Sequence, residues 1–240
     1  MLALHQVEKS FRIDGRAVPI LNIPEWKVEA GEQVAITGPS GSGKSTLLHL
    51  VSGLLRPDRG EIRVDGQALE GLKESELDRY RAGKIGYVLQ DFHLIPSLTA
   101  RQNIELALAA RLSAAERKRL VDGWLERVGM RNRAEHLPSQ LSRGQQQRIA
   151  IVRALINQPL LVLADEPTGS LDWESADTIA ELLLELSGKQ NHTLLVVTHD
   201  RNLARRFPKS VDIYDINRLK PPGYGEKLRL PRIAPEEGAV

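Results

Sequence analysis

One stretch decides the fold of this chain: Gly38-Pro39-Ser40-Gly41-Ser42-Gly43-Lys44-Ser45-Thr46. Apolar residues 34–37 precede it and residues 47–51 follow it, so we predict a strand, a glycine-rich loop and a helix in that order. The glycines let consecutive backbone N–H groups point towards one spot, and the dipole of the helix adds positive potential there. In this pattern Lys44 reaches the β- and γ-phosphates of a nucleotide, while the Ser45 hydroxyl binds Mg²⁺. The stretch therefore predicts a nucleotide-binding site.

The composition is that of an ordinary globular protein. The chain has 240 residues, of which 41% are hydrophobic and 27% charged, enough for one large domain or two small ones. Its 33 basic and 31 acidic residues are well mixed, without the run of like charges that marks a nucleic-acid-binding tail. With no cysteine, disulfides and thiolate metal sites are excluded. No apolar run approaches the ~18 residues that span a bilayer, and the first residues do not resemble a signal peptide. We therefore expect a cytoplasmic protein that does not itself insert into a membrane.

The order of apolar runs and turns predicts an α/β fold. Short apolar segments in residues 2–37, with a hairpin turn at Asp14-Gly15, predict β structure at the N-terminus. Residues 99–157 have helical periodicity, which suggests a helical subdomain inserted between strands. Further strands are predicted at residues 61–64, 85–89, 160–166 and 193–198.

Two of these predicted strands end in residues that could take part in catalysis or metal binding. The run 160–166 is continuously apolar until Asp165 and Glu166, as in a parallel strand covered on both faces. Ligands bind at the carboxyl ends of such strands. In a protein with a phosphate-binding loop, Asp165 would hold Mg²⁺ and Glu166 would orient or deprotonate an attacking water. His199 follows the strand 193–198; it is either structural or, beside the carboxylates, a contact to the γ-phosphate.

Two other positions have both a functional and an ordinary interpretation. Phe11, in the first hairpin, could stack on an adenine ring or be a core aromatic. Ser142 with Gln145 has the spacing of a capping box. It is therefore an ordinary helix start, or a second anion site at a helix N-terminus.

The motifs form an ordered set along residues 1–219. They are Phe11, the Gly38–Thr46 loop, Gln90, Leu141-Ser142-Arg143-Gly144-Gln145, residues 160–166, Ser170-Leu171-Asp172 and His199. Together they resemble the ATP-binding subunit of ABC transporters, in which they are the adenine-stacking aromatic, Walker A, Q-loop, signature, Walker B, D-loop and switch histidine. The segments 86–90, 94–99, 136–141, 145–148 and 164–172 are similar to those of the ABC transporter branch that releases lipoproteins or exports macrolides.

The resemblance implies a P-loop NTPase (RecA-like) fold with a mostly parallel sheet core, an N-terminal antiparallel β subdomain and an inserted α-helical subdomain. The core would cover about 1–89 and 158–219, the helical subdomain about 90–157, and residues 220–240 would be a loosely ordered tail. It also implies ATP hydrolysis with Mg²⁺. Glu166, His199 and Gln90 would be catalytic, and the metal would be bound by Ser45, Gln90 and Asp165. ATP would contact Phe11, every residue from Gly38 to Thr46, and Ser142, Arg143, Gly144, Gln145 and Asp172.

The resemblance further implies two partners. One is a second ATP-binding subunit, giving a head-to-tail homodimer in which Ser142, Arg143 and Gly144 act on the nucleotide of the other chain. The other is an integral membrane permease, received by a groove around residues 90–98 whose apolar segment could also be ordinary subdomain packing. The chain would thus lie at the inner face of the cell membrane without inserting into it, drive movement of lipoproteins, peptides or drugs, and bind no nucleic acid.

Two departures from the family pattern stand out. Arg143 occupies the usual third-position glycine of the signature, where it is strained if the backbone needs φ > 0 and otherwise adds positive charge near the partner's γ-phosphate. The Asp-Gly turn expected after the switch histidine is replaced by Asp215-Ile216-Asn217-Arg218, in which Asn217 could adopt a left-handed conformation.

Three other functions remain possible from the sequence. They are a soluble ABC-type ATPase acting on nucleic acid or ribosomes, a P-loop kinase and a non-hydrolysing regulatory subunit. The first usually carries coiled coils, zinc cysteines or a duplicated cassette, and none of these is present in the sequence. The second would lack the signature and the switch histidine. Intact Lys44, Asp165, Glu166 and His199 argue against the third.

Overall fold

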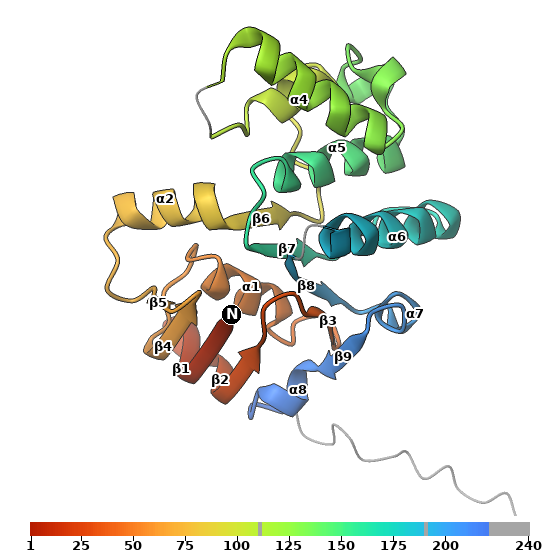
Figure 1. Ribbon diagram of the computed structural model, residues 1–240. Helices are drawn as coiled ribbons and strands as arrows, with labels where there is room; N and C mark the ends of the chain where they lie inside the picture. Colours follow the sequence, from red (N-terminus) through yellow and green to blue (C-terminus); the bar gives the residue numbers. More distant parts are fainter. Residues whose placement is uncertain (110–111, 190–191, 221–240) are drawn as a thin grey trace, which may run out of the picture.

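The computed structural model describes residues 1–109, 112–189 and 192–220 (Figure 1). The predicted tail from residue 220 onwards lies, apart from Lys220, outside these residues.

An antiparallel sheet forms the N-terminal part of the fold. Its strand order is β2-β1-β4-β5, with bounds β1 Leu2–Ile13, β2 Arg16–Val28, β4 Arg59–Val64 and β5 Gln67–Ala68. The hairpin turns at Asp14-Gly15, as predicted, and both residues have positive φ (48° and 76°). Leu4 pairs with Trp26 on one side and Ile62 on the other, and all three side chains are buried on the same face.

A five-stranded parallel sheet forms the centre. The order is β6-β7-β8-β3-β9, with bounds β3 Gln33–Thr37, β6 Ile85–Val88, β7 Leu161–Asp165, β8 Thr193–Thr198 and β9 Lys209–Asp212. The register pairs Thr37 with Thr198 and Asp165 with Val197, so the ends of β3, β7 and β8 meet at one edge. This edge brings the glycine-rich loop, the two carboxylates and the histidine together, because each of them directly follows one of these strands.

Both faces of the parallel sheet are covered. Alternate residues of its strands enter two different hydrophobic clusters, as the period of two in a strand requires. On one face, Ile36, Leu163 and Val197 pack with α1 (Lys44–Val51), which lies between this sheet and the antiparallel one. On the other, Ala164 and Val196 pack with α5 (Arg143–Leu155) and α6 (Trp173–Lys189). The remaining helices of the core are α2 Glu74–Lys84, α7 Arg201–Ala204 and α8 Ile213–Ile216.

The helical subdomain is inserted between β6 and β7 (Figure 1). It contains α3 Ala100–Glu105, α4 Ala114–Arg127, two 3₁₀ turns (η1 Arg131–Arg133 and η2 Pro138–Gln140) and α5. Three of its helices begin with complete capping boxes, at Thr99, Ser113 and Ser142. The predicted fold class, an α/β core with an antiparallel subdomain and inserted helices, is confirmed.

The structure corrects the prediction for Asn217. This residue follows α8 with an extended backbone (φ −95°, ψ 120°), so a left-handed turn at Asn217 is wrong. Its side chain binds β2 instead: Nδ2 donates to the Ile20 carbonyl at 3.0 Å, and Oδ1 accepts from the Asn22 N–H at 2.9 Å. Asn217 is only 1% exposed, so its amide and the backbone groups of β2 need hydrogen-bond partners inside the protein, and they supply them to each other.

Arg143 is the first residue of α5 and does not have positive φ. Of the two alternatives for this position, backbone strain is therefore excluded.

Among the helices that the structure describes, none combines the length and apolar character needed to cross a bilayer.

Candidate nucleotide-binding site

The glycine-rich loop turns sharply into α1. Gly43 is the N-cap of this helix with φ 92°, a conformation that strains residues with a side chain. A Cβ at Gly43 would also lie 2.9 Å from Cδ2 of Leu21 in β2. Gly41 has φ 76° as well. These two left-handed residues leave the first N–H groups of α1 free of side chains above them, which is the geometry of a phosphate cradle.

Lys44 is held within the loop. Its Nζ donates to the carbonyl oxygens of Gly38 and Pro39, each at 2.9 Å, and the residue is 6% exposed. Burial lowers the pKa of Lys44, and the nearby carboxylates of Glu166 and Asp165 oppose this shift. The ammonium is thus largely desolvated, and an anionic ligand would stabilise its charged form.

The Ser42 hydroxyl supplies a second argument for such a ligand. It is buried, and Oγ finds no hydrogen-bond partner among the described residues. A phosphate oxygen above the loop would give this orphaned group an acceptor.

Ser45 and Asp165 form the candidate metal site. The Ser45 hydroxyl donates to Oδ1 of Asp165 at 3.0 Å, from the start of α1 to the end of β7. Burial raises the pKa of Asp165, although the hydrogen bond from Ser45 acts in the opposite direction. Among the described residues, no group of three or more acidic or histidine side chains could hold a metal alone. One carboxylate and one hydroxyl fit Mg²⁺, which keeps several waters and takes oxygens from substrate phosphates.

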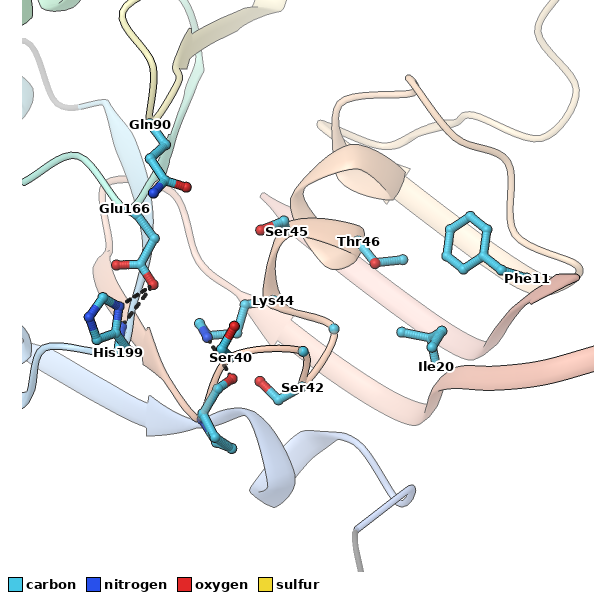
Figure 2. A pocket seen from close by; sticks show the side chains of 13 residues that line it. Phe11, Ile20, Ser40, Ser42, Lys44, Ser45, Thr46, Gln90, Glu166 and His199 are labelled. Carbon is cyan, nitrogen blue, oxygen red and sulfur yellow. Dashed lines mark hydrogen bonds and ion pairs between the residues drawn. The ribbon is translucent and has the colours of Figure 1, made fainter. Parts of the chain in front are cut away.

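Glu166 and His199 face each other across the edge of the sheet (Figure 2). Nδ1 of His199 lies 2.9 Å from Oε1 of Glu166, and the backbone N–H of His199 donates to the same oxygen at 3.0 Å. Thr198 donates its hydroxyl to Oε2 at 3.1 Å. Glu166 has φ 44°, an uncommon left-handed backbone for a residue with a side chain. A strained residue at the mouth of a cavity is typical of a functional position.

Most of these residues line one cavity of about 700 Å³, a size typical of small-molecule sites, while Asp165 lies just behind its wall and reaches it through Ser45. The loop from Pro39 to Thr46 forms its floor, with Gln90, Glu166 and His199 at one end (Figure 2). Phe11, which is 37% exposed, and Ile20 lie at the other end. The predicted aromatic is thus next to the phosphate-binding loop. Ile20 was not predicted, because its place depends on how β2 pairs past an irregularity in β1 between Lys9 and Ser10.

Two residues of α5 support the site and were also missed. Gln147 is fully buried and donates its Nε2 to the carbonyl of Pro167, the residue after Glu166, at 2.7 Å. Arg153 donates to the carbonyls of Phe92 and His93, both at 2.6 Å, in the loop that follows Gln90. In the sequence, both residues look like ordinary polar residues of a helix, because the carbonyls that they bind lie far away in the chain.

The signature and D-loop residues lie outside this cavity. Ser142 is the N-cap of α5, and with Gly144 and Gln145 it lines a separate hollow of about 330 Å³ together with Glu174 and Ser175. The guanidinium of Arg143 lies 5.8 Å from the centre of the Phe92 ring. Asp172 accepts from the N–H and hydroxyl of Ser175 at 2.9 and 2.8 Å, which caps the start of α6. Within one chain, these residues therefore do not reach the nucleotide cavity.

Comparisons with known proteins agree with this geometry. Residues 21–169 match the family model described as ABC transporter. The chain is 42% identical over 214 residues to the lipoprotein-releasing system ATP-binding protein LolD of Hydrogenovibrio crunogenus, covering 89% of this chain and 93% of the relative. It is 41% identical over 216 residues to the macrolide export ATP-binding/permease protein MacB of Marinobacter nauticus, covering 90% of this chain and 33% of that longer protein.

A solved structure is similar over the same length. The ATP-binding cassette MJ0796, a protein of Methanocaldococcus jannaschii, was solved as a dimer in a post-hydrolysis state with ADP and Pi bound. It superimposes with a TM-score of 0.81 at 39% identity and covers 88% of this chain and 94% of its own. On this evidence, the chain belongs to the ABC transporter family as an ATP-binding, ATP-hydrolysing subunit similar to those of the LolD and MacB branch.

Proposed function

We propose that the chain hydrolyses Mg²⁺-bound ATP between two copies of itself and thereby drives a separate membrane permease. The observation that carries this proposal is the separation of the two halves of the site. The cavity at Lys44 holds the phosphate loop, Glu166 and His199, while the separate hollow at Ser142 holds a second helix N-terminus.

Within one chain, the loop and its neighbours bind the nucleotide. The N–H groups of residues 41–46 and the Lys44 ammonium bind the β- and γ-phosphates, and Phe11 stacks on the adenine beside Ile20. Ser45 and Asp165 hold Mg²⁺, with Gln90 reaching the ion or its water. When bound, the ion neutralises charge that develops on the phosphate oxygens.

Glu166 and His199 carry the chemistry. Glu166 lies at the edge of the sheet beyond the loop, where its carboxylate orients a water and accepts its proton. His199 holds that carboxylate in place through its backbone N–H and ring, and its ring contacts the γ-phosphate. The reaction then depends on positioning and on stabilisation of charge, as in other phosphoryl transfers.

A second copy completes the site. In a head-to-tail pair, Ser142 and Gly144 present the N-terminus of α5 to the γ-phosphate bound by the other chain, with Gln145 supporting the Ser142 cap. Arg143 adds a positive charge there, and Asp172 lies at the join between the two copies. The solved dimers of the relative MJ0796 support this arrangement.

The surface beside Gln90 is the proposed docking site of the permease. A groove of about 460 Å³ is lined by Phe92, Leu94, Pro96, Pro138 and Arg143, which belong to the segment after Gln90 and to the start of α5. Movement of this groove on ATP binding would be passed to a permease at the inner face of the cell membrane. The similarity to the lipoprotein-releasing LolD and the macrolide exporter MacB suggests a cargo such as a lipoprotein or drug.

Two variants test the proposal. Glu166→Gln removes the proton acceptor but leaves the phosphate contacts, so it is expected to form a stable dimer with Mg²⁺-ATP on gel filtration and to lose turnover. Lys44→Ala is expected to lose nucleotide binding, measured by calorimetry. Turnover by Glu166→Gln at the normal rate, or tight Mg²⁺-ATP binding by Lys44→Ala, would contradict the assignment of these residues.

A further inference from the structure

Trp173 is the most exposed large apolar side chain among the described residues. It is 77% exposed, whereas the chain's other two tryptophans, Trp26 and Trp124, are 8% and 3% exposed. An indole buries a large apolar area when it is covered, so leaving one in water is unfavourable. Large exposed aromatic residues are the type that most often anchors protein–protein contacts. The established activity gives this side chain no role.

Its place in the chain connects the two halves of the nucleotide site. Trp173 is the first residue of α6 and directly follows Asp172. The segment 166–175 starts at Glu166, in the nucleotide cavity, and ends at Glu174 and Ser175, which line the hollow at Ser142. In a head-to-tail pair the partner covers both the cavity and the hollow. On α6, Trp173 lies on the face away from the Ser142 hollow, but the hollow beside it includes Asp200, which directly follows His199 of the nucleotide cavity. The surface around Trp173 is therefore continuous with the cavity that the partner covers.

A small hollow lies beside the indole of Trp173. It has a volume of about 150 Å³, lies between α6 and α7, and combines the apolar side chains of Ala176, Ala180 and Leu203 with a polar rim of Asp177, Asp200, Asn202 and Arg206. Its walls are held together by Arg206, which makes ion pairs with Asp177 at 2.6 Å and Glu181 at 3.6 Å. Because a symmetric pair presents the same patch twice, each copy offers both an indole and a hollow at its join.

We propose that Trp173 is an apolar anchor of the ATP-dependent pair and packs against the second copy of this chain. The inference rests on the proposed function, because it requires the pair, and it adds a contact that no nucleotide-binding residue makes. Continuity with the nucleotide cavity favours a second copy over the permease as the occupant. When ATP brings the two copies together, the indole of Trp173 becomes buried between them.

The three tryptophans allow a direct test with the full chain in the Glu166→Gln background. Since Trp26 and Trp124 are buried, acrylamide quenches mainly Trp173. Addition of Mg²⁺-ATP is expected to reduce this quenching and shift the emission to shorter wavelength. The same chain with Trp173→Phe is expected to show neither change, which assigns the signal to Trp173.

The contribution of Trp173 to the stability of the dimer is measured in a separate experiment. Analytical ultracentrifugation with Mg²⁺-ATP gives the dissociation constant of the dimer. Trp173→Ala is expected to weaken the dimer by about tenfold or more. Because the side chain is exposed, this variant does not threaten the fold of the monomer. Leu106→Ala is the matched control: Leu106 is 63% exposed but lies at the end of α3 in the helical subdomain, so it should leave the constant unchanged.

The outcomes separate this inference from the proposed function. If Glu166→Gln dimerises with ATP but Trp173 remains as open to acrylamide as in the monomer, or if Trp173→Ala dimerises as tightly as Leu106→Ala, the anchor is overturned and the proposed pair stands. If Glu166→Gln does not dimerise with ATP at all, both are overturned.

Discussion

Glu166 accepts two contacts from a single residue, His199, through one carboxylate oxygen. Oε1 lies 2.9 Å from Nδ1 of the ring and 3.0 Å from the backbone nitrogen. Glu166 is joined to the end of β7 and His199 to the end of β8, so the contact exists because these strands are neighbours in the parallel sheet. The side chain of Glu166 is 13% exposed, and that of His199 is 65% exposed.

His199→Ala is expected to lower the rate of ATP hydrolysis by about 10²- to 10⁴-fold, because the proton acceptor loses its orienting ring. Binding of Mg²⁺-ATP, measured by calorimetry, should change little, since the loop and Asp165 are untouched. His5→Ala, at an exposed position of β1, is the control and should hydrolyse ATP normally. A rate for His199→Ala within threefold of that control would rule out the positioning role.

Arg153→Lys is expected to loosen the loop after Gln90. The guanidinium holds the carbonyls of Phe92 and His93 with two separate nitrogens, and the single nitrogen of a lysine cannot reproduce that two-point geometry. Loss of a hydrogen bond to a charged group costs about 1.5–3 kcal/mol. We expect a lower melting temperature and a fall in kcat with little change in nucleotide affinity. Arg131→Lys, whose contact with Glu126 is exposed, is the matched control. Unchanged stability and kcat in Arg153→Lys would show that the two carbonyl contacts are dispensable.

Asp165→Asn is expected to stabilise the nucleotide-free protein while abolishing hydrolysis. Burial raises the pKa of this carboxyl, which means that its charged form is held at a cost in the folded chain. Asparagine keeps an acceptor for the Ser45 hydroxyl without the charge, so the free energy of unfolding at pH 7.5 should rise by about 1 kcal/mol. Asp58→Asn is the opposite case, because the hydrogen bond from the charged Lys9 lowers the pKa of Asp58, and the variant loses the negative charge of that ion pair and should be less stable. Urea unfolding measures both, and a fall in stability for Asp165→Asn would contradict the argument.

The buried histidine, His192, should make stability depend on pH. Burial lowers its pKa below the ordinary value of 6.5, although a hydrogen bond with the Pro159 backbone opposes the shift. Below pH 6.5 the unfolded chain therefore binds a proton that the folded chain does not, so stability falls as the pH falls. The loss is at most about 1.4 kcal/mol per pH unit.

His192→Gln should reduce this loss between pH 7 and pH 5.5, as measured by urea unfolding at the two values. A variant at an exposed histidine, His5→Gln, should retain the dependence on pH of the unchanged chain. An equally steep fall in His192→Gln and the unchanged chain would show that His192 is not the group responsible.

Much of the candidate site could be predicted because its residues are local to their own motifs. The loop from Gly38 to Thr46 specifies its conformation through its glycines. Asp165, Glu166 and His199 each follow a continuously apolar run, and such runs form neighbouring parallel strands whose ends share one edge. The capping box at Ser142 is likewise a matter of spacing within one turn.

What the sequence could not show depends on contacts between distant segments. Gln147 and Arg153 look like polar residues of any helix until the fold brings α5 against Pro167 and the loop after Gln90. Asn217 was expected in a turn, but its amide instead forms hydrogen bonds with backbone groups of β2, which would otherwise lack partners. The left-handed backbone of Glu166 is similarly set by its surroundings, including the hydrogen bond from its N–H to the Val197 carbonyl at 2.9 Å.

The sequence by itself thus determined the phosphate-binding loop, the fold class and the residues at the edge of the sheet. Glycine conformations, apolar periodicity and helix caps are properties of short segments, so they can be predicted without knowing which distant segments those residues contact. Only the tertiary structure decided that Ser142 and Asp172 lie outside the nucleotide cavity and that Trp173 remains exposed. These facts depend on which surfaces are left uncovered once the chain has packed, and that is a property of the whole fold.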